Sequence, residues 1–433
     1  PTPARPKLPR TSCCKRSFQR VDIATAISVS QSHQRSCKDS LPLTLSDLEG
    51  LPLGCSIVGS RCSRQQLQAH LQPWLQQASG FDLLLLLAAT RTAEREGISA
   101  AGATAASRRL TALADADLLL HGPGQLRRWS LPPLPAGVSP ALLSHVALQR
   151  LPMQPLVAAL GLEHEATFPH LRLESPQAGP ARCLSTGRAM DPERVERLWR
   201  QGMGLGAQLR RPLLLAECVP GGTTTAQAVL TAFGVPVNGL ISGSARQPPQ
   251  ELKRQLVEQG LHRAQLQAWP SPQAVLAAVG DPFQAVAAGV LATAQQPVLL
   301  GGGSQMAAVL ALALASLPDQ QRKVLADRVL LGSTAWLAQE RIRGGDMPAL
   351  GCLLDEVGQR FGVSLAGLAS GLRFHLSRQP ALRDYEDGFV KEGVGAGALL
   401  LLAQLQGQQA EALVEGCERA LDQLLASAVA SEV

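Results

Sequence analysis

Residues 213–234 read LLLAECVPGGTTTAQAVLTAFG, and this stretch indicates the architecture of the whole chain. A short apolar run ends at Glu217, a glycine turn follows, and a helix-forming segment begins at Thr223. A strand with no polar face is typical of a parallel sheet that helices cover on both sides. The stretch is therefore expected to form a buried strand, a turn and a helix packed on the sheet.

Apolar runs of the same kind recur along the chain. They are FDLLLLLAA (81–89), ADLLLH (116–121), PLVAALG (155–161), VNGLISG (237–243), PVLLGGG (297–303) and RVLLGST (328–334). Helices are expected between them, over residues 192–208, 223–233, 249–258, 272–279 and 305–314. This alternation predicts an α/β fold, a doubly wound (Rossmann-like), mostly parallel sheet with helices on both faces.

The ends of the chain lack this alternation. Residues 1–42 are basic and rich in serine, with eight Lys or Arg against two Asp in the first 40, and we expect a disordered tail there. A transit peptide is the alternative interpretation. Residues 43–433 are expected to form one domain, with an α/β core over about 80–345. Residues 43–79 and 346–433 would add a small helical part, which ends in a helix over 397–428.

Composition excludes several classes of protein. Of 433 residues, 45% are hydrophobic and 17% charged, which indicates a globular chain. Aromatic residues make up only 3%, and residues 41–433 carry 32 basic and 32 acidic side chains. A nucleic-acid-binding surface needs basic patches and stacking aromatics, so no nucleic-acid partner is expected.

Neither a membrane span nor a metal site is expected. The uncharged window 298–317 contains three consecutive glycines, which favour a buried strand, a turn and a helix over a span. The nine cysteines form no C-x-x-C pair and the eight histidines are scattered singly, so neither a zinc site nor a disulfide framework is supported. Reduced thiols in the cytoplasm fit this pattern best.

The candidate ligand-binding residues follow the predicted strands, because such sheets bind ligands beyond the carboxyl ends of their strands. Glycines let a ligand approach the backbone, while hydroxyls and the first N–H groups of a helix bind anions, most simply phosphate. A helix cap without a ligand is the alternative for the first turn. No G-K-[ST] follows, so a P-loop is excluded. The three turns contain Gly221, Gly222, Thr223, Thr224 and Thr225; Gly301, Gly302, Gly303 and Ser304; and Ser333 and Thr334.

A further acidic residue stands in KEGVGAGALL (391–400), where Glu392 precedes Gly393 and Gly395. A carboxylate among glycines before an apolar helix is expected to be partly desolvated. Desolvation raises its pKa and suits it to act as a general base. A solvated acid at the helix N-terminus is the alternative. Cys218 has no glycine two residues before it and is interpreted as a small buried residue, not a nucleophile.

These motifs together resemble those of the nicotinate mononucleotide:dimethylbenzimidazole phosphoribosyltransferase family. The segment ECVPGGTTTAQAVL (217–230) is similar to its E-M-G-I-G-N-T-T segment, GGGSQMAAV (301–309) to G-G-x-E-I-A-A, and KEGVGAGALL to G-E-G-[ST]-G-A. Upstream, EREGISAAGAT (94–104) is similar to E-G-V-S. The closer match is to a divergent, uncharacterised branch. The D-H-G that precedes E-G-V-S is replaced by Thr90-Arg91-Thr92, which leaves the acceptor base open.

The resemblance implies transfer of a phosphoribosyl group from nicotinate mononucleotide to an azole or purine base, for the lower ligand of cobalamin. Glu392 would be the catalytic base, Glu217 would stabilise positive charge on the sugar or bind the ribose, and Gly97 and Ser99 would belong to the base pocket. No metal, no cofactor and a cytoplasmic homodimer are implied. Two alternatives remain open: a non-catalytic phosphoribosyl-nucleotide-binding or regulatory protein, and another glycosyl-transferring or hydrolytic enzyme.

Overall fold

The computed structural model describes residues 48, 50–75, 80–124, 127–341 and 347–431, and these contain one eight-stranded sheet. Its order is β1-β8-β7-β6-β5-β2-β3-β4. All neighbouring strands are parallel except β1 and β8, which confirms the predicted mostly parallel sheet. The strands are β1 (Ser56–Val58), β2 (Asp82–Ala88), β3 (Pro155–Leu160), β4 (Leu171–Arg172), β5 (Leu213–Cys218), β6 (Val298–Gly301), β7 (Val329–Ser333) and β8 (Ala366–Ala369).

The strand order reverses between β2 and β5. From β2 the chain adds β3 and β4 on one side, and from β5 it adds β6, β7 and β8 on the other. The two central strands are in register, with Leu87 opposite Cys218. In open α/β sheets, loops leave such a reversal in opposite directions and open a crevice beyond the strand ends.

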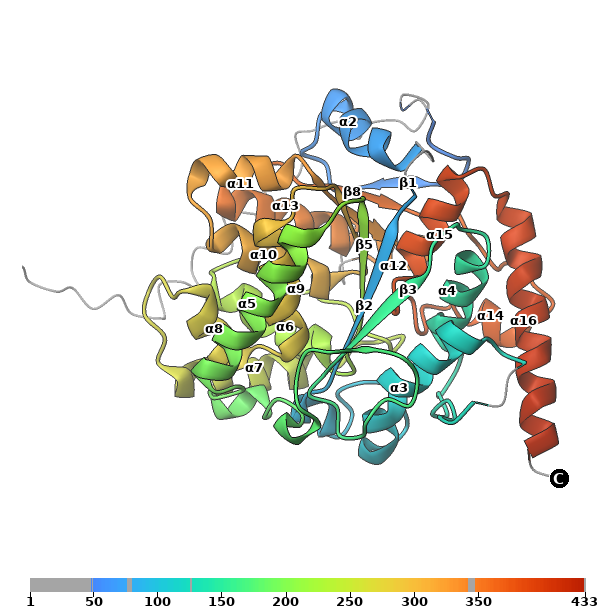
Figure 1. The fold of residues 1–433 in the computed structure, drawn as a ribbon, viewed down its shortest axis with the longest axis horizontal. Helices are drawn as coiled ribbons and strands as arrows, with labels where there is room; N and C mark the ends of the chain where they lie inside the picture. Colours follow the sequence, from blue (N-terminus) through green and yellow to red (C-terminus); the bar gives the residue numbers. More distant parts are fainter. Residues whose placement is uncertain (1–47, 49, 76–79, 125–126, 342–346, 432–433) are drawn as a thin grey trace, which may run out of the picture. The chain divides into compact units, whose positions relative to one another are not determined.

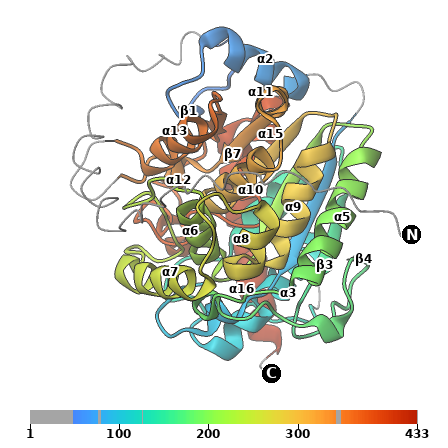
Figure 2. The same ribbon diagram turned by 90° about the vertical axis from the view of Figure 1, so that its left-hand side faces the viewer.

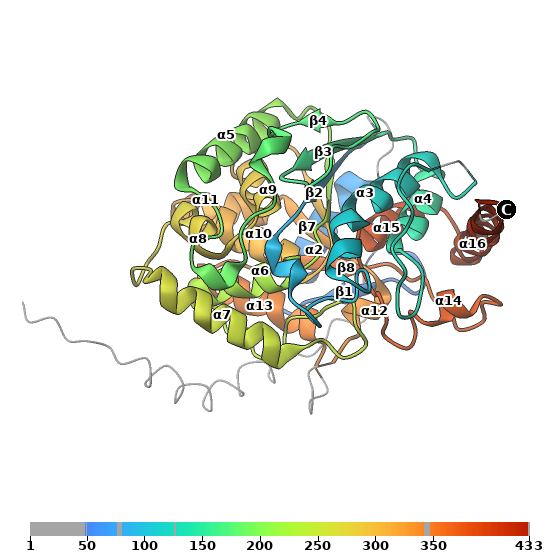
Figure 3. The same cartoon turned by 90° about the horizontal axis from the view of Figure 1, so that it is seen from below.

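Helices cover both faces of the sheet, as predicted. One layer contains α5, α6, α8, α9, α10 and α13, and the other contains α3, α4, α15 and α16 (Figures 1 and 3). Figure 2 shows the first layer face on, with α5 beside α9. The α-helices are α2 (Arg64–Leu75), α3 (Ala105–His121), α4 (Pro140–Leu148), α5 (Pro192–Gln208), α6 (Gly222–Ala232), α7 (Gln250–Ala264), α8 (Pro272–Val279), α9 (Pro282–Thr293), α10 (Ser304–Ala315), α11 (Asp319–Ala326), α12 (Ala335–Ala338), α13 (Ala349–Phe361), α14 (Pro380–Arg383), α15 (Ala396–Leu405) and α16 (Ala410–Ser431).

Burial explains the sequence pattern of the central elements. Every residue of β5, β6 and β7 is buried, because helices lie against both faces of these strands. Helix α15 is buried along its whole length between the sheet and α4. Strands and helices of this kind have no polar face, which is why the chain shows continuous apolar runs.

Two predicted strands are wrong. Residues 116–121 are the last turns of α3, which starts at a capping box formed by Thr104 and Ser107. A short apolar run such as Leu118–Leu120 fits a buried helix as well as a strand, so periodicity did not separate the two. Residues 237–243 contain no strand and consist of a turn over residues 238–240 flanked by irregular backbone, consistent with the Asn238-Gly239 pair.

The ends of the domain differ from the expected helical part. Residues 43–79 and 346–433 contribute β1 and β8 to the sheet as well as helices, and AGLA in β8 is too short to stand out as a strand. The expected helix over 397–428 is two helices, α15 and α16, separated by Gly407, whose φ is +89°. The predicted tail over residues 1–42 lies outside the described residues.

The apolar window 298–317 folds as β6, a turn and α10, as the sequence indicated. Among the described residues, none of the helices combines the length and the hydropathy needed to cross a bilayer.

Candidate active site

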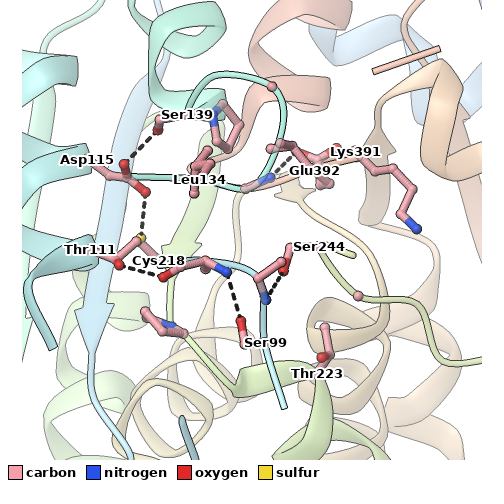
Figure 4. Close-up of a pocket in the computed structure, with 18 of the residues that line it drawn as sticks. Ser99, Thr111, Asp115, Leu134, Ser139, Cys218, Thr223, Ser244, Lys391 and Glu392 are labelled. Carbon is pink, nitrogen blue, oxygen red and sulfur yellow. Dashed lines mark hydrogen bonds between the residues drawn. The ribbon is translucent and has the colours of Figure 1, made fainter. Parts of the chain in front are cut away.

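A cleft with a volume of about 280 Å³ opens at the carboxyl ends of β2 and β5, where the strand order reverses (Figure 4). Segments far apart in the sequence line it: the loop after β2, the turns after β5 and β6, residues 242–244, the proline-rich segment 131–140, and the loop before α15. The cleft thus lies where ligands bind in doubly wound sheets.

One end of the cleft is formed by the N-termini of α6 and α10. Gly221, Gly222 and Thr223 line it from α6, and Gly303 and Ser304 from α10. Gly221 has a φ of +80°, which strongly favours glycine. The N-termini of two helices border the same cleft, and the positive ends of their dipoles suit this end to an anion.

A buried lysine adds a positive charge to this end. Lys253, on α7, is fully buried and donates hydrogen bonds to Thr223 Oγ1 (2.9 Å) and to the Ser242 carbonyl oxygen (2.7 Å). Lys253 does not line the cleft itself but holds Thr223, which does. Burial lowers the pKa of Lys253 to about 7, and the charge of Lys391 acts in the same direction. A bound phosphate would stabilise the charged form.

Glu392 lies in the cleft wall, and its carboxyl group is held by four donors. Oε2 accepts hydrogen bonds from Thr334 N (2.8 Å) and Ser333 Oγ (3.3 Å), and Oε1 accepts from Gly393 N and Gly397 N (3.1 Å each). Burial raises the pKa of Glu392 to about 7 although these hydrogen bonds favour the ionised form. A carboxylate with this pKa can take up a proton near neutral pH.

Glu217, at the end of β5, is the second buried acid of the cleft. Gln305 Nε2 donates a hydrogen bond to its Oε1 (2.8 Å). Burial, together with the nearby carboxylates of Asp281 and Glu392, raises the pKa of Glu217 to about 8. Glu217 therefore holds a proton at neutral pH until a positive group enters the cleft and favours its ionised form.

The other end of the cleft is mainly apolar. Leu131, Leu134 and several prolines of residues 131–140 line it. This segment is held from behind, because Asp384 accepts a hydrogen bond from Gly137 N (2.7 Å) and Tyr385 Oη donates one to the Val138 carbonyl oxygen (2.8 Å). An apolar wall fixed in this way suits a flat aromatic ring.

A small cluster of polar side chains interrupts the apolar end. Thr111 and Asp115, one turn apart on α3, line the cleft together with Ser139 and Cys218. Ser139 Oγ donates a hydrogen bond to Asp115 Oδ1 (2.6 Å), and Cys218 Sγ donates to Asp115 Oδ2 (3.4 Å). Burial raises the pKa of Asp115 to about 6. The interpretation of Cys218 as a small buried residue omits this contact.

The structure brings about half of the predicted site residues into the cleft. Those that line it are Ser99, Glu217, Gly221, Gly222, Thr223, Gly303, Ser304, Glu392 and Gly393. Those outside the lining are Gly97, Thr224, Thr225, Gly301, Gly302, Ser333, Thr334 and Gly395.

The residues outside the lining have other contacts. Ser333 and Thr334 hold Glu392, as described above, and Thr225 Oγ1 donates a hydrogen bond to Asp281 (2.5 Å). A side chain on Gly301 would meet Ala398 and Gly395 on α15 and in the loop before it, at 3.0 Å. Several glycines of the motifs therefore allow close packing of α15 on the sheet.

Sequence reasoning missed Lys253, Asp115, Ser139 and the Ser242–Ser244 segment. None of them stands in a glycine-rich turn, and three of the four lie on or beside helices that only the fold brings to the cleft. The isolated buried lysine of α7 has no sequence pattern that distinguishes it from a surface lysine.

Comparisons with known proteins agree with this geometry. A family model described as phosphoribosyltransferase matches residues 151–326. A UPF0284 protein of Parasynechococcus marenigrum (strain WH8102) is 93% identical over 393 residues, which cover 91% of this chain and 100% of that protein. The chain belongs to the UPF0284 family. Another UPF0284 protein, of Prochlorococcus marinus (strain MIT 9313), is 60% identical over 380 residues, which cover 87% of this chain and 94% of that protein.

Two solved structures share the fold of this chain. CobT from Thermus thermophilus superposes with a TM-score of 0.52 at 20% identity, covering 81% of this chain and 88% of that one. A nicotinate-nucleotide-dimethylbenzimidazole phosphoribosyltransferase structure from the same organism gives 0.51 at 19% identity, covering 81% and 87%. The shared fold and the match of the family model to residues 151–326 confirm the resemblance inferred from the motifs.

Within the described residues, no three His, Cys, Asp or Glu side chains are grouped so that they would hold a metal ion. The charged groups that the described residues bring to the cleft are those of Glu217, Glu392, Asp115, Lys391 and the adjoining Lys253.

Proposed function

We propose that this protein transfers the phosphoribosyl group of nicotinate mononucleotide to an aromatic azole or purine base and releases nicotinate, in the assembly of the lower ligand of cobalamin. One observation carries the proposal: a single cleft joins an anion-binding end to an apolar end, with the buried carboxyl group of Glu217 and the partly buried one of Glu392 in its wall. The family model and the fold support the same chemistry.

The phosphate is assigned to the end formed by α6 and α10. Thr223 and Ser304 offer hydroxyl groups there, and Lys253, buried behind the lining, orients the Thr223 hydroxyl and adds a positive charge. The nucleotide's phosphate is then far from the apolar end, which leaves that end for the aromatic ring of the acceptor. Holding both substrates in one orientation removes much of the entropic barrier to their reaction.

The reaction needs one proton acceptor. A ring nitrogen of the base attacks C1′ of the ribose while the bond from C1′ to the pyridinium nitrogen breaks, and its electron pair neutralises the nicotinate ring. The base nitrogen becomes part of a positively charged azole, whose other N–H proton passes to Glu392. Because the pKa of Glu392 is raised to about 7, its carboxylate is a stronger base than an exposed one.

Glu217 is assigned to the ribosyl group. Its carboxyl group stands at the end of β5, beside the N-terminus of α6 and within hydrogen-bonding distance of Gln305. Positive charge on the substrate's pyridinium ring and on the sugar in the transition state favours the ionised form of this acid. Glu217 therefore stabilises charge that appears during the reaction.

The test is to incubate the purified protein with nicotinate mononucleotide and a panel of bases, and to measure nicotinate release and the ribosylated product. Base-dependent release of nicotinate supports the transferase. Release of nicotinate and ribose 5-phosphate without a base indicates a hydrolase, and binding without release indicates a nucleotide-binding protein. The family resemblance also implies a cytoplasmic homodimer, which analytical ultracentrifugation and localisation of the tagged protein would test.

A further inference from the structure

The polar group at the apolar end of the cleft offers acceptors but no donors among its side chains. Figure 4 shows Asp115, Ser139 and Cys218 together on one side, across the cleft from Thr223. The Ser139 hydroxyl and the Cys218 thiol both donate to Asp115. The Thr111 hydroxyl donates to the Ala101 carbonyl oxygen at 2.7 Å. The protons of these groups are used within the protein, and lone pairs remain for a ligand.

Asp115 also receives no N–H donor, unlike the buried acids Glu217 and Asp281. It receives one hydroxyl and one thiol, and a thiol is a weak donor. Asp281 receives the backbone N–H of Gln284 and the Thr225 hydroxyl, and Glu392 receives four donors. A buried carboxylate is costly unless donors satisfy it, so a ligand that brings an N–H to Asp115 would be favoured.

The chemistry of the base follows from this arrangement, and the inference rests on the proposed transferase function. We propose that the acceptor base carries a hydrogen-bond donor, an amino or ring N–H group, on the edge remote from its attacking nitrogen. Asp115 accepts this hydrogen bond and thereby selects the base, with Thr111 as a second acceptor. A base with methyl groups on that edge would bring no N–H donor to Asp115 and place apolar atoms against a carboxylate.

Two acceptor bases of nearly equal size test the proposal: 5-aminobenzimidazole and 5-methylbenzimidazole. They differ in a hydrogen-bond donor at one position. The ratio of their kcat/KM values therefore measures the hydrogen bond to Asp115 and not the size of the pocket. A hydrogen bond to a charged group corresponds to a preference for the amino compound of roughly 10- to 100-fold. Equal values, or a preference for the methyl compound, would overturn the proposal.

Variants locate the selecting group. Asp115→Asn presents an amide in place of the carboxylate and is expected to bring the ratio close to one. Asp117→Asn is the matched control on the same helix, because Asp117 bonds His121 and Trp129 N and does not line the cleft. If Asp115 only supports the start of α4 through Ser139, both Asp115→Asn and Ser139→Ala would lower stability and leave the ratio unchanged, which contradicts the proposal.

Binding separates this inference from the proposed function. Calorimetric titration of the unmodified protein with each of the two bases measures the preference for the amino compound without turnover. The titration is repeated with protein saturated with nicotinate mononucleotide. Transfer to the methyl compound at an equal or higher rate would reject the inference and keep the transferase. Nicotinate release with neither base would reject the transferase, and the binding preference would then decide the inference alone.

Discussion

Replacing Glu392 by Gln tests the proposed chemistry most directly, and the structure defines its side effects. The carboxyl group accepts from Thr334 N and Ser333 Oγ on one oxygen, and from Gly393 N and Gly397 N on the other. The amide oxygen of Gln can replace only one of these oxygens. Its NH₂ group must therefore face donors on the other side.

The least costly orientation of the Gln side chain places NH₂ toward Ser333, whose hydroxyl can rotate to accept a hydrogen bond. Thr334 N–H then loses its acceptor, and one unpaired buried donor costs about 1–3 kcal/mol of unfolding free energy. The effect on turnover is larger, because an amide cannot take up the proton of the azole. General base catalysis contributes about 10²- to 10⁴-fold, and kcat should fall by that factor.

The assay combines kinetics, unfolding and a control. Nicotinate release gives kcat and KM, urea unfolding gives the loss of stability, and Asp117→Asn provides a carboxylate-to-amide change in a buried position outside the cleft. The control should lose stability and keep kcat. In the wild-type protein, kcat should decrease as the pH falls below about 7, because protonated Glu392 accepts no proton.

Full turnover by Glu392→Gln with every active base would refute the assignment of the catalytic base. Equal losses of kcat in Glu392→Gln and in the Asp117→Asn control would show that the loss reflects stability alone.

Three further changes test the other parts of the site. Lys253→Met removes the buried charge at the anion-binding end, so the KM for the nucleotide should rise roughly 10- to 100-fold. The control Lys323→Met, on the surface, should leave KM unchanged, and steady-state kinetics compares the two variants. Gly222→Ala places a methyl group in steric conflict with Gln305 Oε1, which forces Gln305 away from Glu217, so kcat/KM should fall about tenfold or more while the unfolding midpoint changes little. Glu217, with a pKa raised to about 8, keeps its proton in the folded state where the unfolded chain has lost it, so its contribution to stability decreases as the pH rises from about 4.5 to 8. Glu217→Gln should flatten the decrease in that interval, which urea unfolding at several pH values measures.

The sequence predicted the central strands because a strand buried on both faces must be apolar throughout. That requirement leaves a clear pattern in β2, β5, β6 and β7, and the helix starts after these strands follow from glycine and hydroxyl residues. The same pattern does not identify a strand where a helix is equally buried or where the strand is very short. The end of α3 is as apolar as a strand, and β8 consists of four small or apolar residues at the side of the sheet.

The candidate site was predictable only where its residues follow strands. Glu217, Gly222 and Thr223 line the cleft because a strand end and a helix start fix their positions. Asp115 lines the cleft from α3 and Lys253 contacts its lining residue Thr223 from α7, and no local sequence pattern indicates which face of a helix will meet a turn distant in sequence. Glycine motifs were ambiguous for another reason, since close helix packing and ligand approach both require the absence of a side chain.

The loop that carries Glu392 shows how the fold positions the proposed general base. Val390, Lys391 and Val394 have φ values of +62°, +62° and +54°, a region that costs a non-glycine residue about 1–3 kcal/mol. Hydrogen bonds from Val390 N to the Ser244 carbonyl oxygen (2.9 Å) and from Val394 N to the Glu217 carbonyl oxygen (3.0 Å) offset this cost. They tie the loop to both walls of the cleft. The carboxyl group is thereby fixed before any substrate binds, and the azole proton has only to displace one of its four hydrogen-bond donors.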